Sequence, residues 1–71
     1  MNVVETVYVT VSAVDTSGKT ARVSVPVRAT VVSGKITGVT NPSMSEVSRA
    51  AGYECRSYTA PTMAEVQRAY G

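Results

Sequence analysis

The chain has 71 residues, the length of one small domain, which excludes a multidomain enzyme or a long repeat array. Valine occupies 14 positions and alanine 8, whereas leucine, phenylalanine, tryptophan and histidine are absent, so the core must be built from small side chains. The net charge of +2 is too small to indicate a strongly basic surface. The absence of histidine removes the usual general base and the usual zinc ligand.

The first 40 residues alternate between apolar and polar side chains, which is the pattern of half-buried strands. Apolar residues take the odd positions from Val3 to Val14, with Glu5 and Val4 as exceptions near the start, and again from Ala21 to Val31. Between these strands, residues 15–18 have the composition of a turn. A three-residue loop that pairs Asp15 with Lys19 sets valine opposite valine, whereas a two-residue loop would set valine opposite threonine or serine. We therefore predict the three-residue loop.

A second turn at Ser33 and Gly34 leads into a third predicted strand, Lys35 to Thr40. In this register three pairs face one another: Ile36 and Val31, Gly38 and Ala29, and Pro26 and Asn41. Pro26 has no N–H to donate, so we expect the ladder between the second and third strands to end there.

The remainder of the chain contains an internal repeat. The segment Pro42–Gly52 recurs nineteen residues later as Pro61–Gly71, with seven of eleven positions identical. Each copy begins with a capping box and ends at a glycine suited to a left-handed cap. Each predicts a helix of about two turns, too short to be stable without packing. The linker Tyr53–Ala60 is predicted to be extended or irregular.

The predicted fold class is α+β: a three-stranded antiparallel β-meander followed by two short α-helices (β-β-β-α-α). Residues 1–40 would form the meander and residues 41–71 a duplicated helical docking segment, within one small domain overall. The N-terminal residues lack the basic and apolar stretches of an export signal, and no segment approaches the ~20 apolar residues of a membrane span. We expect a soluble protein, located inside the cell or within an assembled particle.

Few residue patterns point to chemistry. No pair of carboxylates is placed by a recognisable motif, and the Gly18-Lys19-Thr20 triplet lacks the upstream glycine and the following helix of a phosphate loop. The single cysteine, Cys55, cannot form an internal disulfide, and without histidine we interpret it as a buried or incidental thiol. We therefore predict no enzymatic activity and no catalytic, cofactor-binding or metal-binding residues.

The repeat has two interpretations. In the first, both helices simply cover the sheet, with Glu46 and Arg49, and Glu65 and Arg68, as surface ion pairs. Capping and an apolar stripe do not, however, require arginine and alanine to recur. In the second interpretation the repeat is a docking element, in which methionine gives an adaptable contact and arginine a directional one. The candidate partner-binding residues are Met44, Val47 and Arg49 in the first copy and Met63, Val66, Arg68 and Tyr70 in the second.

The sheet itself also points to partners. Its apolar face consists of small side chains, so we expect the isolated fold to be marginally stable. The first strand would leave one edge unpaired over its whole length, and Lys19 to Val25 of the second strand would be bare on its outer side. Such edges favour strand addition by another chain.

These features predict a non-enzymatic small structural or linker subunit of a larger multi-copy assembly, for example a virus or phage particle. Its partners would be proteins, including other copies of itself. An alternative is a nucleic-acid-binding module that uses Tyr8, Arg22 and Arg28 on the polar sheet face, although two arginines and one tyrosine make a weak signal. A third possibility is a regulator that inhibits an enzyme by edge pairing.

Overall fold

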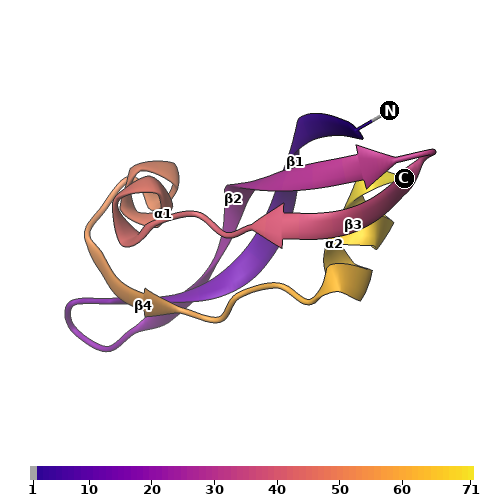
Figure 1. The fold of residues 1–71 in the computed structure, drawn as a ribbon. Coiled ribbons are helices and arrows are strands. Elements are labelled where there is room, and N and C mark those ends of the chain that lie inside the picture. The colour runs from indigo at the N-terminus through magenta and orange to yellow at the C-terminus, as the bar shows by residue number, and fades with distance from the viewer. Residues whose placement is uncertain (1) are drawn as a thin grey trace.

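A computed structural model describes residues 2–71 and contains a four-stranded antiparallel sheet with two helices (Figure 1). The elements are β1 (Asn2–Asp15), β2 (Thr20–Val32), β3 (Lys35–Thr40), α1 (Met44–Ala51), β4 (Cys55–Tyr58) and α2 (Met63–Tyr70). The strand order in the sheet is β3-β2-β1-β4. The α+β class, the first three strands and both helices are confirmed. The predicted order is incomplete, because β4 lies between the helices.

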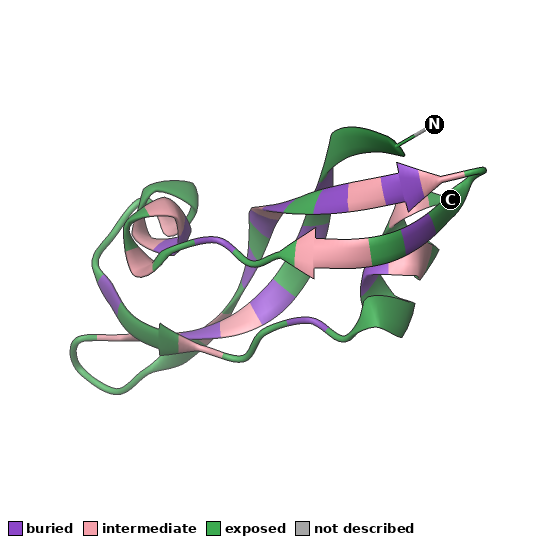
Figure 2. Cartoon of the chain, in the orientation of Figure 1, coloured by how far each residue is buried: buried purple, intermediate pink, exposed green. Residues whose placement is uncertain are grey.

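The long hairpin of β1 and β2 has the register that the valine pattern predicts. The Asp15 N–H donates to the Lys19 carbonyl at 2.9 Å across a three-residue loop, and Val11 faces Val23. Gly18 closes this loop with a φ of +92°, a conformation that favours glycine. The odd positions of both strands consequently share one face, and buried residues alternate with more exposed ones along the hairpin (Figure 2).

The turn between β2 and β3 is confirmed, but the register beyond it changes. Ser33 and Gly34 both have positive φ, at 51° and 78°, and Ile36 faces Val31 as predicted. A bulge at Thr37 then shifts the pairing by one residue, so that Gly38 faces Thr30. Two expected pairs are therefore wrong: Gly38 with Ala29, whose partner is Val39, and Pro26 with Asn41.

The ladder between β2 and β3 ends at the pair of Arg28 and Thr40. It therefore stops before Pro26, whose partner on the other side is Tyr8 of β1. The sequence predicts that the ladder ends near this proline, and it does. Pro26 has no N–H to donate, and at its position no β3 carbonyl is paired with β2.

The linker between the helices is more ordered than expected. Its residues Cys55–Tyr58 form β4, which pairs antiparallel with Ala13 to Asp15 of β1. The Thr59 N–H extends this contact by donating to the Ser12 carbonyl at 2.9 Å. The prediction that β1 is unpaired along one whole edge is therefore wrong. No alternating pattern marks β4, because among its four residues only Cys55 is buried.

Both helices close one core over the odd-numbered face of the sheet. Val25, Val27 and Ala29 of β2 have no exposed surface, and each helix adds one fully buried valine, Val47 or Val66. In the described part of the chain, the buried valines and alanines, Ile36 and Cys55 belong to a single cluster. Within residues 2–71, every buried side-chain polar atom has a hydrogen-bond partner.

The strands repeat one another about an approximate two-fold axis through the pair of Val9 and Val25. The pattern Val-x-Val-x-Val-x-Ala occupies residues 7–13 of β1 and residues 23–29 of β2. β4 pairs with β1 as β3 pairs with β2, since Tyr58 faces Ala13 where Val39 faces Ala29. Each outer strand also has a one-residue register shift at the equivalent place, which skips Arg56 in β4 and Thr37 in β3.

The helices obey the same symmetry. α1 packs against β2 and β4, and α2 packs against β1 and β3, so the helices lie at opposite ends of the sheet (Figure 1). Ser48 Oγ accepts a hydrogen bond from the Cys55 N–H at 2.9 Å, and Gln67 Oε1 accepts one from the Ile36 N–H at 2.9 Å. The two acceptors are equivalent in the repeat, as are the two donors. The half made of β2, β3 and α1 is thereby interlocked with the half made of β1, β4 and α2.

Candidate functional site

Each helix is fixed by the capping box that its sequence predicts. The Glu46 N–H donates to Ser43 Oγ and the Ser43 N–H donates to Glu46 Oε1, and Thr62 and Glu65 make the same two bonds in α2. The bond from the cap backbone is the main reason why the pKa of each glutamate lies below its usual value. Gly52 ends α1 in the left-handed region, at φ +85°. The outer faces of both helices are thus presented in defined positions.

The predicted partner-binding residues separate into inner and outer groups. Val47 and Val66 are fully buried, so they hold the helices on the sheet and do not lie on an accessible surface. Met44 is half-buried and packs against the core. These three side chains are explained by folding, because a short helix is stable only when its apolar face is packed.

The outer group consists of Arg49, Arg68 and Met63. Both arginines are exposed, and Met63 is 43% exposed. Tyr70 is intermediate: its ring packs against the core and its hydroxyl donates to Glu5 Oε2 at 2.9 Å. This hydrogen bond raises the pKa of Tyr70 above its usual value and ties the end of α2 to the start of β1.

Arg49 lines a shallow groove of about 270 Å³ between α1 and the polar sheet face. We call it the Tyr8 groove; its lining residues are Tyr8, Pro26, Glu46, Arg49 and Ala50. The two-fold axis relates Tyr8 to Ser24 and Pro26 to Thr10, so the equivalent surface beside α2 has two small polar residues in place of the tyrosine and the proline. The helix residues recur in the other half, as Glu65, Arg68 and Ala69, but the aromatic wall does not.

The proposed nucleic-acid residues share one sheet face but do not form one patch. Arg22 and Arg28 are six residues apart on β2, roughly 20 Å at 3.3 Å per residue. Besides the cap bonds, Arg28 lowers the pKa of Glu46 and Arg22 lowers that of Glu65, so a helix carboxylate accompanies each arginine. Tyr8 is 66% exposed and therefore accessible for stacking. The neighbouring carboxylates reduce the positive potential that a nucleic acid would meet.

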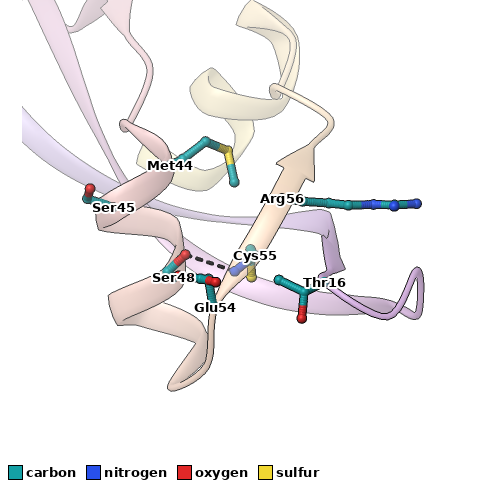
Figure 3. A pocket seen from close by; sticks show the side chains of 7 residues that line it. All are labelled: Thr16, Met44, Ser45, Ser48, Glu54, Cys55 and Arg56. Atoms are coloured by element: carbon teal, nitrogen blue, oxygen red, sulfur yellow. Dashed lines mark hydrogen bonds between the residues drawn. The ribbon is translucent and has the colours of Figure 1, made fainter.

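A cleft of about 470 Å³ lies between α1, β4 and the loop of the first hairpin (Figure 3). It is lined by Thr16, Met44, Ser45, Ser48, Glu54, Cys55 and Arg56. Cys55 is buried, as predicted, and its thiol donates to the Tyr53 carbonyl at 3.7 Å. The Ser48 hydroxyl is engaged with the Cys55 backbone, and the Arg56 side chain extends away from the thiol in Figure 3. This arrangement lacks the adjacent cation that activates a reactive cysteine.

The start of β1 is the main exposed apolar segment that the sequence pattern missed. All residues from Asn2 to Thr6 are exposed, including Val3 at 45% and Val4 at 65%. The alternation placed Val3 on the buried face with the later valines. That placement fails because α2 ends at Tyr70, whose hydroxyl reaches only as far as Glu5.

Within residues 2–71, no three side chains of the metal-ligating types gather into a group. Neither helix in that range has the length and apolar character needed to cross a membrane. Comparison of the chain with protein-family models, curated proteins and solved structures finds no match.

Proposed function

We propose that the chain is a non-enzymatic structural or linker subunit of a larger multi-copy protein assembly, for example a virus or phage particle. In this role it binds protein partners through the outer faces of its two equivalent helices and through its strand edges. The observation that carries this proposal is the recurrence of Arg49 and Arg68 at equivalent, exposed positions.

Folding accounts for most of the repeat without any partner. The prolines are buried at the strand ends, the hydroxyl residues and glutamates form capping boxes, the valines fill the core, and the glycines end the helices. A basic residue in the last turn also stabilises a helix through its dipole, but lysine would serve equally well. Arginine differs from lysine in offering a planar, bidentate contact to carboxylates. Its recurrence therefore supports directional recognition of an acidic group on a partner.

The two-fold arrangement suits a linker. Two equivalent surfaces on one small chain can engage two equivalent segments of an assembly. When both are engaged together, the second binding event is intramolecular and the overall affinity exceeds that of either site. Because the halves are interlocked through Ser48 and Gln67, the spacing of the two surfaces is fixed.

The proposal is tested by affinity isolation from a native lysate of the source cells, with the tag at the C-terminal end. The test variant carries Arg49→Glu and Arg68→Glu, and the control carries Arg22→Glu and Arg28→Glu, which change the net charge equally. We expect wild type and control to retain the same partner protein and the test variant to lose it, with circular dichroism confirming that all three are folded. A partner held equally well by both variants would overturn docking through the helices.

The second candidate function is nucleic-acid binding, which the 66% exposure of Tyr8, on the strand next to that of Arg28, favours. The same variants test it in a filter-binding assay with oligonucleotides. Oligonucleotide retention that falls steeply with added salt, and that the Arg22 and Arg28 changes abolish, would support this candidate instead. The identity of any captured protein separates a structural subunit from an enzyme regulator.

A further inference from the structure

We propose that the exposed start of β1, Asn2–Thr6, pairs antiparallel with the same segment of a second copy of this chain. This would continue the sheet across a two-fold axis at Val4. The inference rests on the proposed function, in which strand edges bind partners, and it names the occupant of one such edge.

The backbone of β1 is open on the required side. β4 pairs only with Ala13 to Asp15, and the Ser12 carbonyl accepts the Thr59 N–H on that same outer edge. Because backbone groups alternate along a strand, Val4 and Thr6 direct their N–H and carbonyl groups outward as Ser12 does. Among residues 2–71, only β2 pairs with Asn2–Thr6, so this outer row is available to another strand.

The side chains of this segment are self-complementary. Pairing about Val4 places the two Val4 side chains together and places Val3 opposite Glu5 of the second copy. Glu5, the only charge in the segment, lies opposite Val3 and not opposite its own counterpart, so the two carboxylates are diagonal neighbours and no like charges are directly opposed. Val3 and Val4, which lie on opposite faces of the strand and are 45% and 65% exposed, would both lose contact with water.

The outer edge of β2, which the two-fold axis relates to this edge of β1, is protected against strand addition. The two-fold axis relates Val4 to Thr20 and Thr6 to Arg22. That edge carries two basic residues, Lys19 and Arg22, and is interrupted further on by Pro26. Charges and proline are the usual means of preventing strand addition. Charged residues and a proline thus protect this edge in β2, whereas the equivalent edge of β1 carries valines. This difference favours pairing through β1 alone.

The register is tested by cross-linking in a Cys55→Ala background. Val3→Cys and Glu5→Cys variants are mixed and oxidised gently. In the proposed register positions 3 and 5 form a non-hydrogen-bonded pair with Cα atoms about 4.5 Å apart, close enough for a disulfide. We expect the mixed cross-link to dominate over both self-cross-links by about tenfold, a 1.4 kcal/mol preference. A statistical mixture of the three products, or no product, would overturn the proposal.

A second measurement leaves Cys55 intact. Light scattering at about 100 µM, a concentration suited to small interfaces, should give twice the chain mass of 7.4 kDa for wild type. Val4→Lys should return the mass to that of one chain, while Thr20→Lys, at the equivalent edge of β2, should leave the dimer intact. A monomeric wild type, or equal responses of the two variants, would contradict the pairing. Helix docking would remain testable through Arg49 and Arg68, so failure of one proposal is distinguishable from failure of the other.

Discussion

Replacing Val47 with alanine should destabilise the protein about as much as replacing Val66. The two valines have equivalent positions in the repeat, and both are fully buried. Each packs its helix against one strand of its own half and one strand of the other half. The two-fold arrangement therefore predicts matched energetic roles.

The expected cost follows from the atoms removed. Each substitution deletes two buried methyl groups, at about 0.8 kcal/mol apiece for transfer from water. The cavity left behind raises the total to about 2–3 kcal/mol, because a well-packed core relaxes only partly. The helices lie at opposite ends of the sheet, so the two costs should add. The double variant would lose about 4–6 kcal/mol, which is most of the stability expected of a domain this small.

Urea unfolding followed by circular dichroism measures these costs at about 1 µM, where the proposed pairing through β1 is dissociated by dilution, with Val4→Ala as the control. Val4 is 65% exposed, so its truncation should cost less than about 0.5 kcal/mol. The double variant should be largely unfolded in water. The reasoning would be refuted if Val47→Ala or Val66→Ala behaved like Val4→Ala, or if one helix valine proved several times more costly than the other.

Three further predictions concern acid, a turn and the thiol. The capping bonds hold the pKa values of Glu46 and Glu65 below the ordinary 4.5, so the stability they provide is present above that pH and is lost as the pH falls below it. Changing both to glutamine, which can also cap, should flatten the pH dependence of urea unfolding. Gly34→Ala, at φ +78°, should cost about 1 kcal/mol, whereas Gly38→Ala, where a Cβ meets no atom within 4 Å, should not lower the urea midpoint. Cys55 should react with a thiol reagent at the rate of global unfolding, and rapid labelling of the folded chain would show that its burial is wrong.

The hairpin register is predictable from sequence because a one-residue slip would move every valine to the wrong face. The helices are predictable because a hydroxyl residue, a glutamate three residues later and a terminal glycine mark their ends. In both cases the signal is local, or is repeated many times along the chain.

The remaining features depend on contacts between distant segments. β4 is held by its pairing with β1 and by the bond from Cys55 to Ser48, neither of which leaves a pattern in four residues. The bulge at Thr37 lets Ile36 and Val39, three residues apart, both meet the core, which strict side-chain alternation does not predict. Likewise, the exposure of Val3 depends on where α2 ends, and the burial of Val47 depends on how closely α1 approaches the sheet.

The central claim is that neighbouring molecules complete this chain. It is tested most directly by the urea midpoint of the 71-residue chain, measured from about 1 to 100 µM, since a complex gains stability with concentration by mass action. We predict that the midpoint rises over this range and that Val4→Lys abolishes the rise. A midpoint that stays constant, together with a mass of 7.4 kDa at the highest concentration, would contradict the claim.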